Sequence, residues 1–198
     1  MQIDNLFPVP VFSTFLNVDL EKLQGMVYGE EEDNKKGRNK SGTGYQTEDR
    51  DYEKYKFLFD QIFPHTVEFF KEFGYEGELF LDNFWFNINR YKEGNKTHSH
   101  PCTSIAGVFY VKTPENCGNI VFENPNCHID WTWTEDRIKE RNPYNHQSYF
   151  FNSKENLLLM FPSYLRHYVN MNKSQEDRIS MSFNLGCRQI NTNKETDT

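Results

Sequence analysis

The 198-residue sequence has few cysteines, and cationic residues are in the minority. Its four cysteines include no CxxC pair, so we expect free thiols and not a disulfide framework. The 22 Lys and Arg stand against 29 Asp and Glu, which gives a formal net charge of −7. A chain of this charge lacks the basic surface that is typical of nucleic-acid binders, and we expect no nucleic-acid partner.

Long apolar runs are also missing. The longest clean run, residues 105–111, is far shorter than the roughly 20 residues of a membrane-spanning helix. Asp4 comes early and Lys22 is the first basic residue, which does not fit a secretory or transit signal. We therefore expect a cytoplasmic protein with no membrane partner, and the length favours a single domain over residues 1–198.

Aromatic residues, in contrast, are abundant: 18 Phe and 11 Tyr can fill a core. Apolar residues at helical spacing predict helices at residues 19–28 and 52–73. Gly29 is the predicted end of the first helix, and Pro64 is expected to kink or split the second. Residues 3–16 read as an extended lead-in at the edge of a sheet, because they contain two prolines.

After residue 77 the apolar pattern changes to period two, which is typical of strands. The predicted strands lie at residues 79–90, 103–112, 119–123, 149–151, 156–161, 167–170 and 178–187. Helices followed by short strands favour a mainly β fold, a β-sandwich or jelly roll with an N-terminal helical layer. In this division residues 1–76 supply the lead-in and the helices, and residues 77–190 supply the β core. The polar insert 124–148 is either a lid over the barrel mouth or a plain surface loop.

Three histidines stand where a metal site can form. His98 and His100 are two residues apart at a strand end, and extended chain points both imidazoles to the same side. His167 follows a buried-looking strand and a turn. Three ligands on one face of an octahedral metal leave about three open positions, which suits non-haem Fe(II) binding O2 and a chelating acid. Arg178 and Ser180 share one face of the last strand, and a planar guanidinium there could hold the far carboxylate of that acid.

The chain resembles the 2-oxoglutarate/Fe(II)-dependent oxygenases, and more narrowly a 2OG-Fe(II) oxygenase family of uncharacterised bacterial and phage proteins. The residues that carry the resemblance span about residues 44–187. They are Gly44-Tyr45-Gln46-Thr47, Asn89-Arg90-Tyr91-x-x-Gly94, His98-x-His100-Pro101, Gly107-Val108-Phe109-Tyr110-Val111, Pro114, Gly118, Phe122, Pro125, Phe161-Pro162-Ser163, His167 and Arg178-Ile179-Ser180-x-Ser182-Phe183-Asn184. The resemblance implies a double-stranded β-helix, which is a jelly-roll barrel of the cupin type. It also implies Fe(II) as cofactor, with 2-oxoglutarate and O2 as cosubstrates.

Carried over position by position, the resemblance assigns roles to individual residues. His98 matches the first metal ligand and His167 the distal histidine. Four residues match cosubstrate-binding positions: Arg178, Ser180, Tyr91 and Asn89. Of these, Arg178 would pair with the C5 carboxylate of 2-oxoglutarate, and no catalytic side chain is expected beyond the metal site. The implied activity is hydroxylation of a peptide side chain or a small metabolite with release of succinate and CO2, and a homodimer stays open.

Position 100 departs from the family pattern. Most of these enzymes carry Asp or Glu two residues after the first histidine, whereas this chain has His100. One interpretation, which we adopt, is that His100 ligates and completes an all-histidine triad. The other is a two-histidine site with water in the gap. A neutral third ligand makes the iron more positive, which should tighten the binding of anionic cosubstrates.

Other assignments of the metal site and of the function compete with this one. His128-Ile129-Asp130 supplies a second HxD spacing and could pair with His167, or line the substrate mouth, although no RYxxG segment precedes it. Three histidines with water are also a zinc arrangement, so a cupin-like zinc hydrolase is an alternative. A non-catalytic binding module that keeps the barrel is the third. A zinc site has no need of the arginine at position 178, so this residue discriminates among them.

Overall fold

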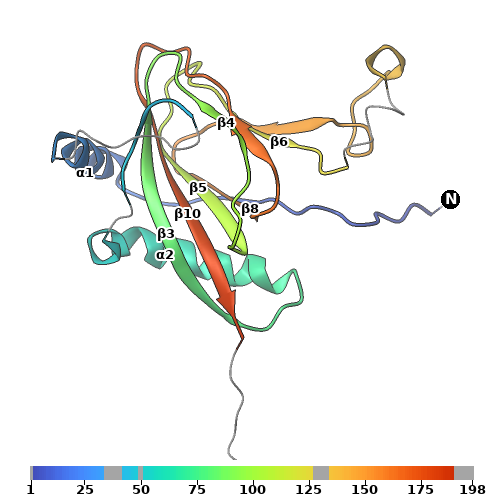
Figure 1. Cartoon of the computed structure of the whole chain (residues 1–198), viewed down its shortest axis with the longest axis horizontal. Coiled ribbons are helices and arrows are strands. Elements are labelled where there is room, and N and C mark those ends of the chain that lie inside the picture. Colours follow the sequence, from blue (N-terminus) through green and yellow to red (C-terminus); the bar gives the residue numbers. More distant parts are fainter. Residues whose placement is uncertain (1, 34–41, 49–50, 127–133, 190–198) are drawn as a thin grey trace, which may run out of the picture.

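A computed structural model describes residues 2–33, 42–48, 51–126 and 134–189 (Figure 1). Within this part of the chain, two α-helices accompany two antiparallel sheets, so the prediction of a mainly β fold is confirmed. In chain order the elements are β1 (Phe12–Phe15), α1 (Leu20–Asp33), β2 (Tyr45–Gln46), α2 (Tyr52–Lys71), β3 (Glu78–Asn89), β4 (Asn95–His98), β5 (Ile105–Lys112), β6 (Ile120–Glu123), the 3-10 helix η1 (Glu135–Arg137), β7 (Ser148–Phe151), β8 (Leu157–Pro162), β9 (His167–Val169) and β10 (Arg178–Arg188).

The strands form two antiparallel sheets. One has the order β1-β8-β5-β10-β3-β2 and the other β4-β9-β6-β7. Apolar residues from β5 and β8 of the first sheet share one core cluster with β6 of the second, so the sheets face each other across this core. Strand β1 comes from the predicted lead-in and occupies a sheet edge, whereas β2 and β4 are short strands that the sequence pattern did not predict as separate elements.

Strand β10 shows how the two faces of the larger sheet differ. Its outward residues are apolar and belong to the cluster that contains the helices: Ile179, Met181, Phe183 and Leu185. The alternate residues are polar: Arg178, Ser180, Ser182 and Asn184. Strand β3, paired with β10 in register, repeats the pattern with Trp85, Asn87 and Asn89 as the inward residues. Because side chains alternate between faces, the period-two pattern places a polar row inside the barrel.

The helices cover the outward face of the larger sheet (Figure 1). Helix α2 begins at its cap Asp51, whose side chain accepts a hydrogen bond from the Glu53 backbone N–H. Its residues Tyr55 and Phe59 are fully buried, and full burial of one such side chain stabilises the fold by about 1.5–3 kcal/mol. The helix is not split at Pro64, because buried residues on both sides of the proline pack into the same core and outweigh one lost hydrogen bond.

Helix α1 runs four residues beyond the predicted end at Gly29, and that prediction is wrong. Its last turn is held by partners from elsewhere in the chain. Glu31 accepts two hydrogen bonds, of 2.7 and 2.8 Å, from one guanidinium nitrogen of Arg90, and Glu30 forms an ion pair with Lys54. These contacts outweigh the local preference of glycine for a helix end. None of the helices described here is both long and apolar enough to cross a bilayer.

Candidate metal centre

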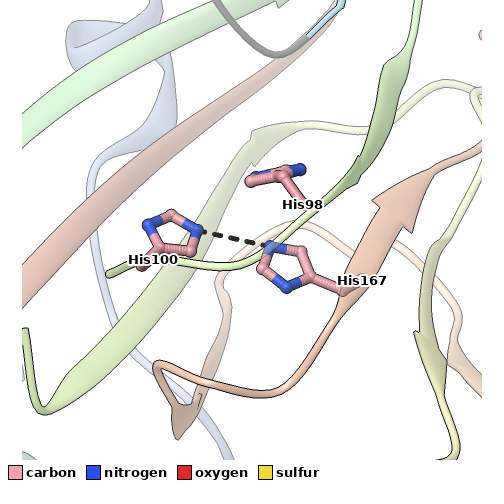
Figure 2. Close-up of side chains that lie close together, drawn as sticks. All are labelled: His98, His100 and His167. Atoms are coloured by element: carbon pink, nitrogen blue, oxygen red, sulfur yellow. Dashed lines mark hydrogen bonds between the residues drawn. The ribbon is translucent and has the colours of Figure 1, made fainter. Parts of the chain in front are cut away.

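Three histidines, two from residues 98–100 and one at position 167, lie close together (Figure 2). His98 ends β4 and His167 begins β9, and the antiparallel pairing places these two residues opposite each other. Their ring centroids are 4.4 Å apart. His100 follows in the turn after β4, where its backbone N–H donates to the Ser163 carbonyl over 2.9 Å. Strand register therefore fixes two of the imidazoles, and a loop contact fixes the third.

The ring nitrogens converge as metal ligands do. One nitrogen from each histidine lies within 4.8 Å of the others, and no further cluster of this kind occurs in the described part of the chain. Nε2 of His100 lies 3.4 Å from Nε2 of His167. Two nitrogens bound at right angles to one ion at about 2.1 Å would be about 3 Å apart, so small ring movements suffice to bind a metal.

The outer nitrogens of two rings are anchored. Nδ1 of His98 lies 2.8 Å from the Lys96 carbonyl, and Nδ1 of His167 lies 2.9 Å from the Leu165 carbonyl. A carbonyl only accepts, so each Nδ1 carries the proton and each Nε2 presents a lone pair to the cluster. Metal-ligating histidines are oriented in this manner.

Burial keeps the imidazoles neutral. It is the main reason that the pKa of His167 falls to about 3 and that of His100 to about 4, and the nearby His98 contributes to both shifts. A hydrogen bond to the Leu165 carbonyl acts in the opposite direction on the pKa of His167, and the nearby Asn184 side chain does so on the pKa of His100. A metal needs the neutral form of each ring, so at neutral pH no proton must leave His100 or His167 before the ion binds. The donor set therefore fits an Fe(II) ion.

Arg178 lies in the same cavity as the histidines. Its side chain is 1% exposed, and its Nη1 donates to the carbonyls of Cys117 and Asn170 over 2.8 and 3.2 Å. Nη2 donates to Oδ1 of Asn89 over 2.9 Å. Burial lowers the pKa of Arg178, but a guanidinium stays charged at neutral pH. No carboxylate of a described residue forms an ion pair with this cation.

Comparison with known proteins identifies the family. The family model described as "Putative 2OG-Fe(II) oxygenase" matches residues 83–184, which is more than half of the chain and includes all three histidines and Arg178. The chain belongs to this family of 2OG-Fe(II) oxygenases. The predictions of the family, of an enzyme and of Fe(II) with 2-oxoglutarate and O2 are thereby confirmed. A comparison with curated protein sequences finds no match.

Solved structures share the fold of the oxygenase at low sequence identity. A Pseudomonas putida prolyl-4-hydroxylase matches with a TM-score of 0.60 and 12% identity, covering 91% of this chain and 92% of that one. A viral collagen prolyl hydroxylase of Paramecium Bursaria Chlorella virus-1 matches with a TM-score of 0.59 and 13% identity, covering 91% and 96%. An oxidoreductase of the 2OG-Fe(II) oxygenase family from Burkholderia pseudomallei has a TM-score of 0.45 at 14% identity, with 58% of this chain and about half, 48%, of that chain covered.

A buried tyrosine that the sequence motifs did not indicate, Tyr110, lies near Arg178 in the oxygenase. Tyr110 of β5 is 2% exposed, lines the cavity and pairs in register with Ser180 of β10. Burial raises the pKa of Tyr110, and Arg178 and Ser153 act in the opposite direction, so its hydroxyl lies in the field of the cation. The period-two pattern of residues 105–112, with Ala106, Val108 and Tyr110 inward, was the signal that could have found it.

The other predicted cosubstrate residues divide into two groups. Asn89 and Ser180 are buried and line the cavity beside Arg178. Tyr91 does not line it: the side chain is 46% exposed, with the Lys92 ammonium 5.0 Å from the centre of its ring. The prediction rested on the resemblance to the family, but β3 ends at Asn89 and the chain then turns, with Lys92 at φ 67°. The structure therefore corrects the placement of Tyr91.

Part of the insert 124–148 lies outside the described residues, including His128, Asp130, Trp131 and Trp133. The alternative HxD ligand pair and the aromatic part of the predicted lid fall there and stay untested. None of the described residues of the insert lines the cavity of the oxygenase. A lid role for this segment stays a prediction.

Proposed function

We propose that the protein hydroxylates a C–H bond of a peptide side chain or a small molecule, with Fe(II) held by His98, His100 and His167. In the balanced reaction, O2 and 2-oxoglutarate are consumed with the substrate C–H, and succinate, CO2 and the C–OH product are formed. The bound metal supplies the oxygen chemistry, and the chain supplies binding, orientation and exclusion of water.

The observation that carries the proposal is the buried guanidinium of Arg178 in the cavity of the three histidines. A buried cation without an anionic partner is unfavourable by several kcal/mol, so the site is built for an anion. A dicarboxylic keto acid supplies one carboxylate for the arginine and a second carboxylate with a keto oxygen for the metal. This arrangement favours an oxygenase over a zinc hydrolase, for which Arg178 would have no partner.

Neighbouring residues give the acid its orientation. Asn89 and two backbone carbonyls hold the fork of Arg178 through three hydrogen bonds. Tyr110 and Ser180 lie in register at the next inward level of the sheet, where their hydroxyls can donate to the same carboxylate. The acid then extends from Arg178 along the polar row of β10 towards the histidines.

Two classes of substrate fit this chemistry. Two of the solved structures with this fold are, by their names, prolyl hydroxylases, which supports a peptide side chain as one class. A small metabolite is the other class. Because the chain carries a net charge of −7, we propose that its substrate is not a nucleic acid. We keep the homodimer and the cytoplasmic location as expectations.

Binding of 2-oxoglutarate tests the proposal before any substrate is known. The protein is loaded with Ni(II), which does not turn over, and titrated with 2-oxoglutarate in a calorimeter. Replacing Arg178 by Met removes the cation at similar volume, and we expect affinity to fall at least about 100-fold, the size of a lost buried charge pair. Arg178→Lys keeps a point charge but loses the fork, and we expect an intermediate loss.

Arg166→Met is the matched control, because Arg166 is an exposed arginine whose Nε binds Glu123 over 3.0 Å at the surface. We expect its affinity for 2-oxoglutarate to stay within about threefold of the wild type. Ni(II) affinity, measured for each variant, shows whether the histidine cluster is still folded. The proposal fails if the Ni(II)-loaded wild type does not bind 2-oxoglutarate, or if Arg178→Met binds it equally well.

Turnover is tested separately with Fe(II) and O2, by measuring succinate from 2-oxoglutarate with panels of peptides and small molecules. Succinate formation that requires Fe(II), and not Zn(II), supports the oxygenase. Hydrolysis by the Zn(II)-loaded protein, without use of 2-oxoglutarate, would instead establish the zinc alternative.

A further inference from the structure

Asn184 stands next to the metal centre, and no role has yet been assigned to it. It lies on the inward face of β10, 8% exposed, between Asn83 of β3 and Ala106 of β5. Its amide nitrogen donates to Oδ1 of Asn83 over 2.8 Å. Its own Oδ1 is buried and has no hydrogen bond of regular geometry among the described residues. A buried acceptor without a partner is destabilising, so it calls for an explanation.

The explanation comes from comparing the three imidazoles. His98 and His167 are each anchored through Nδ1 by the backbone carbonyl two residues earlier, from Lys96 and Leu165. No such carbonyl contact exists for His100 among the described residues. Its Nε2 already faces His167, and its other nitrogen points away from the cluster (Figure 2). The ring therefore needs an acceptor on its outer side if it is to be oriented like the others.

Two side chains flank this ring. Trp85 of β3 stacks on it, with ring centroids 6.1 Å apart and an interplanar angle of 20°, but a stacked indole offers no hydrogen-bond acceptor to the outer nitrogen of the imidazole. Asn184 lies near enough to His100 for its side chain to raise the pKa of the imidazole, although the two groups form no hydrogen bond of regular geometry. Its amide nitrogen is tied to Asn83, so Oδ1 is the atom that remains for the imidazole. A small rotation of the ring on metal binding would complete the bond.

We propose that Asn184 is a positioning residue that accepts a hydrogen bond from Nδ1 of His100 and so aims Nε2 at the metal. This inference rests on the proposed ligation by His100. It gives the third ligand a side-chain anchor, where the other two have backbone anchors. The all-histidine triad then depends on a residue outside the HxH motif, 84 positions along the chain.

A pair of variants isolates the acceptor. Asn184→Leu has similar volume and no acceptor, whereas Asn184→Asp restores an oxygen at the same place. For the protein without 2-oxoglutarate, we expect the Leu variant to bind Ni(II) about 10- to 100-fold more weakly, as for other groups that orient a ligand. We expect the Asp variant to stay within about threefold of the wild type. The Cu(II)-loaded proteins should show three imidazole nitrogens by electron paramagnetic resonance in the wild type and Asp variant, and two in the Leu variant.

Asn83→Leu separates positioning from a merely structural role. It removes the other partner of Asn184 but leaves Oδ1 in place. We expect Ni(II) affinity within about threefold of the wild type, with three coordinated imidazoles retained. If Asn83→Leu weakens the metal site as much as Asn184→Leu, Asn184 acts only as a link between strands and the inference is wrong. Unfolding midpoints of the metal-free variants identify any that do not fold, and Asn184→Ala then replaces the Leu variant.

The failure of the inference and that of the proposed function give different results. Suppose that the wild type shows three coordinated imidazoles and that Asn184→Leu matches it in Ni(II) affinity and in spectrum. This result overturns only the role of Asn184. If the wild type shows two coordinated imidazoles and His100→Ala shows the same two, ligation by His100 and the positioning role of Asn184 are both overturned. In neither case is the 2-oxoglutarate titration of the Arg178 variants affected.

Discussion

Arg178 donates a hydrogen bond of 2.9 Å to Oδ1 of Asn89, and the amide nitrogen of Asn89 donates in turn to the Thr43 carbonyl over 3.0 Å. The second bond fixes which end of the amide faces the guanidinium. The buried cation is thus held by a neutral acceptor, which orients the guanidinium without cancelling its charge. A carboxylate at this position would hold it equally well and would leave no charge for a ligand.

Asn89→Asp tests this distinction. A carboxylate beside Arg178 would be ionised and would form a buried ion pair, so we expect 2-oxoglutarate affinity of the Ni(II)-loaded protein to fall about 100-fold. The unfolding midpoint should hold or rise, because the cation gains a partner. Calorimetric titration and denaturant unfolding measure the two quantities.

Asn89→Leu is the companion variant. It leaves the charge of Arg178 intact but removes an acceptor, and we expect a lower unfolding midpoint with a loss of affinity of about tenfold or less. If the Asp variant bound 2-oxoglutarate as tightly as the wild type, the cavity charge of Arg178 would not be what holds the acid.

Tyr110 and Tyr91 form a matched pair for a second prediction. Tyr110→Phe removes a buried hydroxyl near Arg178, and we expect 2-oxoglutarate affinity to fall about tenfold, the value of a hydrogen bond to a charged group. Tyr91→Phe changes an exposed side chain outside the cavity and should change affinity less than about twofold. The same calorimetric titration measures both. The reverse order of effects would return the cosubstrate role to Tyr91.

The barrel could be predicted because apolar residues alternate with period two along its strands. The same alternation predicted that Arg178 and Ser180 lie on one face of the last strand. The sequence predicted the three histidines through motif spacing, and their meeting depends on a strand register that no local pattern encodes. It could not predict the end of α1, because Glu31 is held by Arg90, 59 residues away. Tertiary contacts of this kind override local propensity.

Tyr91 and Tyr110 show the same limit at the site itself. Both positions belong to recognisable motifs, but which tyrosine reaches the arginine depends on where β3 ends and on how β5 pairs with β10. A one-residue change in the position of a strand end turns a side chain from the interior to the solvent. Motif resemblance transfers residue types and spacing, and it does not transfer such local geometry.

Gly107 supports a third prediction, on stability. A Cβ at this position would lie 2.1 Å from Cζ of Phe183, its cross-strand partner on β10. The ring of Phe183 is fully buried in the core beneath the helices and cannot move aside easily. We expect Gly107→Ala to lower the free energy of unfolding by about 1–3 kcal/mol through overpacking. Chemical denaturation of the metal-free protein measures this value.

Gly25 provides the control for that substitution. It lies within α1 with no heavy atom within 4 Å of an added Cβ. Gly25→Ala should raise the free energy of unfolding by about 0.5–1 kcal/mol, because alanine favours the helix interior. Stabilisation by Gly107→Ala would show that Phe183 repacks and that the contact is not tight.

The buried imidazoles give the metal-free protein a defined dependence on pH. His100 and His167 have pKa values of about 4 and about 3 in the folded state, against an ordinary value of 6.5. Between pH 6.5 and these lower pKa values, the two histidines are protonated in the unfolded chain but not in the folded chain, so acid favours unfolding. Their contribution to stability is fully present above pH 6.5 and is lost as pH falls towards 4 and then 3. Free energies of unfolding at pH 7.5 and 5.5 should therefore differ by about 1–1.5 kcal/mol for each of these two histidines.

A variant without the two imidazoles isolates their share. Between pH 7.5 and 5.5 the free energy of unfolding of metal-free His100→Gln/His167→Gln should fall by about 2–3 kcal/mol less than that of the wild type, because glutamine does not titrate in this range. Equal losses in the two proteins would mean that the imidazoles are solvated and protonate freely in the fold. Ni(II) should steepen the dependence of the wild type, since the ion binds the neutral rings and competes with protons, and it should leave the double variant unaffected.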